Sequence, residues 1–194
     1  MVTNVRSIYY VAASLDGFIA DERDRLEWLF AFDGAPGIKA RYDALLAGVG
    51  ALVMGARTYD FLREHAGAEW PYPDHMTFVV ARRAREAWPG ARIAFVSGPL
   101  GDWLPEVEEA ARRSEREGIW VVGGGEVAGQ FLAEDALDEL HLSIAPVLLG
   151  GGTPLLPTLG QRSLEHLETT PLGLGLVELR YRIVPRGQAG APRA

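Results

Sequence analysis

Two segments of the chain place glycine between an apolar run and a second run with helical spacing. They are IWVVGGGEVAGQFL (residues 119–132), with three consecutive glycines, and ALVMGARTYD (residues 51–60), with Gly55. Glycine lacks the Cβ that would keep a ligand away from the backbone N–H groups at the start of a helix, where phosphate groups bind favourably. The spacing therefore predicts two phosphate-binding turns.

Basic and hydroxyl side chains follow such turns and strands. Arg57 can form a bidentate pair with phosphate oxygens, and Thr58 offers a hydroxyl and an N-cap. Arg82 and Arg83 follow directly on an apolar run. A single arginine of this kind is more often a solvated edge, but three in loops after strands suit the extra phosphate of NADP. Glu126 favours the positive end of a helix dipole but repels a phosphate, so we expect it to have a peripheral role.

The glycines admit two other interpretations. Gly123-x-Gly125-x-x-Ala128 satisfies the loose dinucleotide fingerprint of a Rossmann dehydrogenase. That fingerprint belongs in a first βαβ unit with an acidic residue after the next strand, whereas Asp138 and Glu139 precede their strand, which disfavours this class. Glycines that only let a helix pack closely on a sheet remain an alternative.

The elements that would position these residues alternate along the chain. Short apolar runs predict strands at residues 7–13, 51–54, 76–81, 93–97, 119–122 and 139–145. Helices are predicted at residues 38–48, 106–117 and from 126 to 132, and residues 166–170 and 175–184 alternate as one or two antiparallel strands do. The pattern predicts an α/β fold with a mixed sheet.

Composition limits the class of protein. With 194 residues and 48% hydrophobic residues, we expect a single domain over residues 1–184 and a disordered tail over residues 185–194. A net charge of -7 argues against a nucleic-acid surface, and no apolar run is long enough to span a membrane. The absence of cysteine excludes disulfides and thiolate catalysis, and the histidines show no metal-ligand spacing, so we expect a cytoplasmic protein without a metal.

Five segments in order resemble the dihydrofolate reductase-like superfamily. They are YYVAASLDGFIA (9–20), LVMGARTYD (52–60), VVARR (79–83), IWVVGGGEVAGQFL (119–132) and LDELHLSIAPVLLGGGTPLLP (137–157). Within the superfamily, the chain looks most like the branch related to the C-terminal reductase domain of the riboflavin-biosynthesis deaminase-reductase. The resemblance implies a mixed, mainly parallel eight-stranded sheet flanked by helices, with NADPH across the strand ends, and a homodimer.

The resemblance also implies which residues hold NADPH. The first strand around Ala12, and Ile19 after it, contact the nicotinamide end, and Ser14 and Asp16 are the polar groups nearest to it. We therefore take Ser14 and Asp16 as candidates for proton relay or substrate orientation, although Asp16-Gly17 also makes a turn. The phosphates and the adenosine end contact Gly55, Arg57, Thr58, Arg82, Arg83, Gly123, Gly124, Gly125, Glu126 and Val127.

The expected activity is hydride transfer from NADPH to a C=N or C=O bond of a small heterocyclic or sugar-derived substrate, similar to the riboflavin-biosynthesis reductase. True dihydrofolate reductases carry an acidic residue on their first helix that holds the pterin, and Lys39 stands near that position here. Two alternatives stay open: a non-catalytic NADPH-binding module, and a pterin or dihydrofolate reductase.

Overall fold

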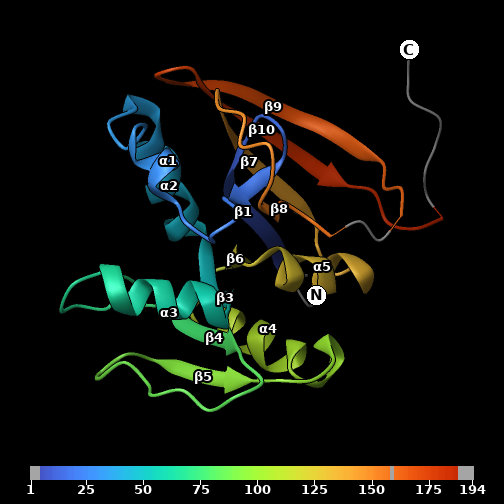
Figure 1. Cartoon of the computed structure of the whole chain (residues 1–194). Helices are drawn as coiled ribbons and strands as arrows, with labels where there is room; N and C mark the ends of the chain where they lie inside the picture. Colours follow the sequence, from blue (N-terminus) through green and yellow to red (C-terminus); the bar gives the residue numbers. More distant parts are fainter. Residues whose placement is uncertain (1–4, 158–159, 188–194) are drawn as a thin grey trace.

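The computed structural model describes residues 5–157 and 160–187. Its main feature is an eight-stranded sheet in the order β5-β4-β3-β6-β1-β7-β10-β9, with β5 and β9 at opposite ends of the molecule (Figure 1). The strands are β1 (Arg6–Ser14), β3 (Val49–Gly55), β4 (Met76–Val80), β5 (Ile93–Val96), β6 (Gly118–Gly123), β7 (Glu139–Ala145), β9 (Leu164–Gly173) and β10 (Leu176–Ile183). The strands from β5 to β7 in this order run parallel, and β10 runs antiparallel to both of its neighbours. The predicted mixed, mainly parallel sheet is confirmed.

Helices cover both faces of this sheet. They are α1 (Glu27–Phe30), α2 (Pro36–Gly48), α3 (Ala56–His65), α4 (Leu104–Arg113) and α5 (Gly125–Ala133), with a short 3-10 helix η1 (Leu100–Asp102) before α4. Two very short strands, β2 (Phe18–Ala20) and β8 (Thr153–Pro154), pair with each other outside the main sheet. This pairing joins the loop after β1 to the loop after β7.

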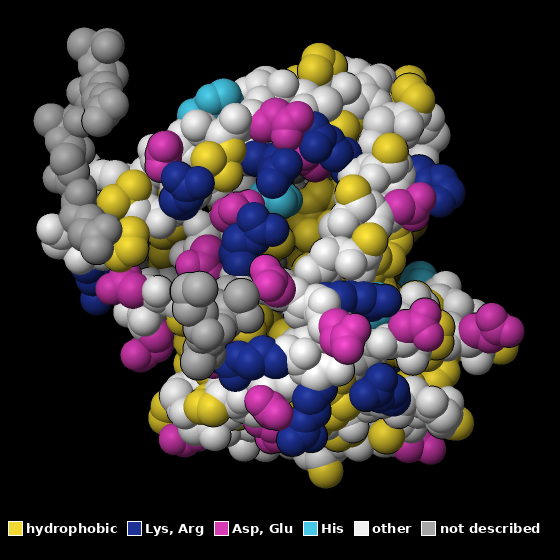
Figure 2. All heavy atoms as spheres, turned by 180° about the vertical axis from the view of Figure 1, so that it is seen from behind, with side chains coloured by type: hydrophobic (Ala, Val, Ile, Leu, Met, Phe, Trp, Pro, Cys, Tyr) yellow, Lys and Arg dark blue, Asp and Glu magenta, His cyan; other side chains and the backbone are white. Residues whose placement is uncertain are grey.

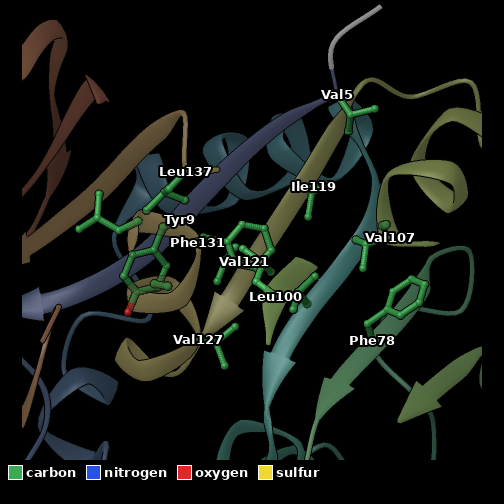
Figure 3. Packing of buried hydrophobic residues seen from close by; sticks show 14 of the residues in the cluster. Val5, Tyr9, Phe78, Leu100, Val107, Ile119, Val121, Val127, Phe131 and Leu137 are labelled. Carbon is green, nitrogen blue, oxygen red and sulfur yellow. The ribbon is translucent and has the colours of Figure 1, made fainter. Parts of the chain in front are cut away.

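The core lies in two layers, one on each face of the central strands. On one face, Val107 of α4 and Phe131 of α5 pack with Tyr9 and Val121 (Figure 3). On the other face, residues of α2 and α3 pack against the opposite side chains of the same strands, as the burial of every residue of β3 except Gly55 requires. Central strands covered on both faces account for the nearly continuous apolar runs in the sequence.

The predicted helix over residues 106–117 was wrong at both ends, because α4 begins at Leu104 and ends at Arg113. Glu115 has a φ of 59°, a left-handed conformation that does not continue a helix. The helix α1 and the strands β2 and β8 were not predicted. Of the predicted disordered tail, residues 185–187 are exposed and residues 188–194 lie outside the described residues. Across the described part of the chain, none of the helices has the length and apolar character needed to cross a membrane.

Candidate functional site

The two predicted phosphate-binding turns lie next to each other in the structure. β3 and β6 are neighbouring parallel strands, so α3 and α5, which follow them directly, begin at the same edge of the sheet. Gly55 is the N-cap of α3 and Gly124 is the N-cap of α5, and within the described residues neither cap makes a side-chain hydrogen bond. The first N–H groups of a helix have no partner in a preceding turn of that helix, so the N-termini of α3 and α5 can both contribute donors to an anion, except for the N–H of Val127, which is bonded to the carbonyl oxygen of Gly124.

Each of the three consecutive glycines has its own structural reason. A Cβ on Gly123 would lie 2.8 Å from the hydroxyl oxygen of Thr58, and one on Gly125 would lie 2.7 Å from the carbonyl oxygen of Pro154. These two glycines therefore also serve close packing, as one interpretation of the sequence expected. Gly124 has a φ of 91°, which favours glycine, and its Cβ would lie 3.7 Å from the Cα of Gly55. The backbones of the two turns thus approach each other closely.

The polar residues after Gly55 differ in exposure. The Arg57 side chain is 81% exposed and pairs with Asp24 at 3.3 Å. Asp24 also accepts a hydrogen bond from the Thr153 hydroxyl at 2.8 Å. Thr58 lies in the first turn of α3 beneath Gly123, so its predicted role as the N-cap was wrong, because Gly55 occupies that position.

The arginines after β4 lie beside α3. Arg82 and Arg83 are exposed, whereas Arg85 pairs with Asp60 of α3 at 2.9 Å. A second pair, Arg63 with Glu86 at 3.1 Å, fastens the same segment. β4 is the neighbour of β3 in the sheet, and the helix that carries Arg57 follows β3 directly. Arg82 and Arg83 follow β4. Three predicted phosphate ligands thus follow adjacent strands.

Ser14 and Asp16 fasten two loops at the end of β1. The buried Ser14 hydroxyl donates to Asp16 at 2.6 Å and accepts from the backbone N–H of Phe18 at 3.0 Å. Asp16 also accepts from the backbone N–H groups of Leu149 and Gly150 at 3.1 and 2.7 Å. The hydrogen bond from Ser14, with those from the backbone, lowers the pKa of Asp16 to about 2. The contacts give both residues a loop-positioning role, and their part in proton relay stays a prediction.

The other predicted contacts spread over the same edge. Ala12 lies in β1 and Ile19 in β2, both half-buried. Glu126 is exposed in the first turn of α5, in agreement with a peripheral role. The Val127 side chain is packed in the core, and its backbone N–H is bonded to the carbonyl oxygen of Gly124 at 2.9 Å. Val127 therefore stabilises the glycine turn through its packing and its backbone hydrogen bond.

Sequence reasoning missed a group of charged residues between α2 and the sheet. Arg41 of α2 contacts Glu168 of β9 and Glu178 of β10, and Glu139 and His141 of β7 lie beside them. The available signal was charged residues at alternate positions of predicted strands, ELHLS and VELRYR, which is unusual for buried strands. Figure 2 shows basic, acidic and histidine side chains gathered in a hollow of the surface.

Comparison with known proteins agrees with this fold. The profile of the RibD C-terminal domain matches residues 7–177. An uncharacterized Bacillus subtilis protein, YwjB, is 28% identical over 176 residues, covering 91% of this chain and 97% of its own. A putative riboflavin biosynthesis protein from Shewanella is 28% identical with a TM-score of 0.79, and the match covers 93% of this chain and 99% of that one.

More distant solved structures share the fold. The riboflavin biosynthesis reductase Rib7 of Saccharomyces cerevisiae is 15% identical with a TM-score of 0.62, over 95% of this chain and 91% of its own. The deaminase-reductase of Thermotoga maritima is 14% identical with a TM-score of 0.68, over 93% of this chain and 57% of its own. These likenesses establish a riboflavin-biosynthesis reductase-like fold.

Proposed function

Because the chain belongs to the family of RibD C-terminal domains, we propose that it is an NADPH-dependent reductase. Its reaction would be hydride transfer to a C=N or C=O bond of a small heterocyclic or sugar-derived substrate. A reductase-like fold is what the family and the solved structures have in common with this chain. The cofactor and the reaction are the proposed part.

The observation that carries this proposal is the pair of helix N-termini that meet at Gly55 and Gly124. A dinucleotide has a pyrophosphate that needs several N–H donors, and glycine backbones let it approach them. A Cβ at Gly124 would stand between the two turns, 3.7 Å from the Cα of Gly55. The N-termini of α3 and α5 therefore fit the pyrophosphate of NADPH.

The arginines near these turns are suited to bind the phosphate oxygens of NADPH that the helix N-termini do not reach. Arg57 would bind a pyrophosphate oxygen, and Arg82 and Arg83 would bind the 2'-phosphate that distinguishes NADPH from NADH. Asp24 competes with the ligand for Arg57, because it holds the guanidinium at 3.3 Å. An exposed pair of this kind contributes only about 0.2–1 kcal/mol, so a doubly charged phosphate can displace the carboxylate.

The cofactor supplies the hydride, and the protein supplies position and electrostatics. The loop after β1 is held by the Ser14–Asp16 contact and by the hydrogen bonds that Asp16 accepts from Leu149 and Gly150, so it would border the nicotinamide end as a fixed wall. Ala12 of β1 would lie under that ring. A fixed wall orients the reacting groups and excludes water from the transfer.

The alternative of a non-catalytic NADPH-binding module depends on whether the chain has residues that can bind a substrate. The Lys39 side chain is 83% exposed and pairs with Asp43, and Asp33 is also exposed. Neither residue therefore offers a buried charge to a substrate beneath α2. The expected homodimer stays a prediction.

The proposed function is tested by incubating the purified protein with NADPH and panels of pterins, pyrimidine precursors of flavins and simple carbonyl compounds. We expect loss of nicotinamide absorbance with at least one nitrogen heterocycle or sugar-derived carbonyl. Tight NADPH binding without turnover across the panels would favour the non-catalytic module instead.

A further inference from the structure

The proposed cofactor would cross the carboxyl ends of the strands in one direction. The phosphate-binding turns follow β3 and β6, and Ala12 lies in β1, the next strand of the sheet (Figure 1). β7 and then β10 come after β1 in the same order. A substrate that meets the nicotinamide on the side away from the phosphates would therefore lie near the end of β7 and the start of β10.

Three segments of the chain meet at this part of the edge. Leu15, in the loop after β1, donates its backbone N–H to the carbonyl oxygen of Val147 at 2.8 Å. The turn between β9 and β10 is also close, because a Cβ on Gly175 would lie 3.0 Å from Cγ of Pro146. We call the segments together the β1–β7 rim, which consists of residues 15–36, 146–157 and 173–175.

The β1–β7 rim exposes apolar side chains. Across the described residues, five large hydrophobic side chains are exposed, and the rim contains four of them: Leu15, Phe30, Leu148 and Leu174. Leu15 and Leu148 are the most exposed, at 63% and 71%, and their loops are joined by the backbone hydrogen bond to Val147. Single exposed leucines are common, whereas a group of them at one edge indicates that an apolar surface binds there.

The charge of the rim is negative. Residues 15–36 contain six carboxylates and two arginines, a net charge of -4, and residues 146–157 contain no charged side chain. Near the rim, ion pairs of the described residues join Arg25 to Asp21, Arg57 to Asp24 and Lys39 to Asp43. The carboxylates outside these pairs are Asp16, Glu22, Glu27 and Asp33.

Two of these carboxylates lie against the loop after β7. Asp16 accepts hydrogen bonds from two backbone N–H groups of that loop, and its low pKa keeps it charged. A Cβ on Gly151 would lie 2.8 Å from Oε1 of Glu22. Both charges thus border the uncharged loop that carries Leu148.

The proposed phosphate ligands lie at the other part of the edge. Arg57 follows β3, and Arg82 and Arg83 follow β4, whereas β7 is on the opposite side of β6 and β1. Side chains of one charge sign lining one part of a surface raise the local concentration of ligands of the opposite sign and repel those of the same sign. The edge therefore favours phosphate near β3 and β4 and disfavours it at the β1–β7 rim.

We propose that the substrate of this protein has no phosphate group and is a neutral or positively charged molecule with an apolar face, bound against Leu15 and Leu148. This inference rests on the proposed function, because the position of the substrate follows from that of NADPH. A phosphate ester in this place would approach the charges of Asp16 and Glu22. A neutral ring or an amine would not be repelled.

The test measures the binding of three probes by calorimetry to the wild-type protein saturated with NADPH at low ionic strength. The probes are benzyl alcohol, benzyl phosphate and benzyltrimethylammonium, which share one ring and differ in charge. Repulsion by the rim carboxylates predicts that benzyl phosphate binds at least about tenfold more weakly than benzyl alcohol. Benzyltrimethylammonium should bind at least as tightly as the alcohol.

Two pairs of variants locate the effect. Glu22→Arg should strengthen binding of benzyl phosphate about three- to tenfold, whereas Glu106→Arg, on the exposed side of α4, changes the net charge equally and should not. Leu148→Ser should weaken binding of all three probes by about threefold or more. Its control is Leu164→Ser, because Leu164 is also exposed but lies at the start of β9, outside the rim.

The possible failures are distinct. Benzyl phosphate that binds as tightly as benzyl alcohol, or an equal effect of Glu22→Arg and Glu106→Arg, would overturn the inference. Failure of both the alcohol and the cation to bind would also overturn it, because contact with the leucines is part of it. Absence of NADPH binding to the wild-type protein would instead overturn the proposed function.

Discussion

Replacing Gly55 with alanine adds one methyl group at the place where α3 and α5 begin. Gly55 has φ and ψ of -75° and 161°, which alanine adopts without strain. The new Cβ would lie 3.4 Å from Cγ2 of Val127 and 4.0 Å from the Cα of Gly124. We therefore expect the free energy of unfolding to change by no more than about 1 kcal/mol, or a Tm change of about 2–4 °C in a domain of this size.

The effect on the ligand should be much larger. The methyl group would stand between Gly55 and the glycine turn of α5, next to the helix N-termini that are proposed to hold the pyrophosphate. Each charged hydrogen bond contributes about 1.5–3 kcal/mol. Loss of one such bond predicts NADPH binding about 10- to 150-fold weaker in Gly55→Ala.

The assay combines calorimetric titration of NADPH with thermal melting of the wild type, Gly55→Ala and Gly48→Ala. Gly48 is the control because a Cβ there has nothing within 4 Å, and it ends α2 away from the two turns. Gly48→Ala should bind NADPH as the wild type does. An unchanged melting curve with NADPH affinity within about twofold of wild type in Gly55→Ala would refute the backbone cradle.

Three further predictions concern charged groups. Asp24→Asn should bind NADPH up to about fivefold more tightly, because it releases Arg57 and asparagine tolerates the φ of 58° at this position; weaker binding in the same titration would contradict the competition. Arg82→Gln with Arg83→Gln should bring the affinities for NADPH and NADH closer together, whereas Arg113→Gln on α4 should leave their ratio unchanged; an unchanged ratio in the double variant would remove these arginines from the 2'-phosphate site. The pKa of Asp16 is about 2 in the folded protein, against 3.8 for an unperturbed aspartate, so its stabilising contribution is present above pH 3.8 and lost as pH falls toward 2. Thermal melts from pH 6 to pH 2 should therefore show a smaller acid-induced loss of stability in Asp16→Asn, and parallel curves would contradict this linkage.

The central strands could be predicted because their signal is local. Runs such as ALVM and IWVV are covered on both faces, so burial appears as continuous apolar sequence around β3 and β6. The glycine turns could be predicted from the same local signal, since Gly55 and Gly124 come at the ends of these apolar runs. Their contact with each other depends on the neighbouring positions of β3 and β6, which the structure shows and the sequence did not predict.

The short strands β2 and β8 and the charged group beneath α2 could not be predicted, because they form through pairing of strands that are far apart in the sequence. β2 has three residues and β8 has two, and they form a sheet only because Phe18 meets Pro154 across the chain. The alternation in VELRYR indicated a strand, but not that Glu178 would face Ser143 and Ala12. That row depends on the register of three strands, and a shift of one residue would turn Glu178 to the opposite face.

The central claim is tested most directly by titrating NADPH and NADH separately against the purified wild-type protein in a calorimeter. The paired helix N-termini and the arginines after β3 and β4 predict saturable binding of one NADPH per chain. Loss of the charged contacts to the 2'-phosphate predicts NADH binding at least about tenfold weaker. Negligible binding of both nucleotides would contradict the account.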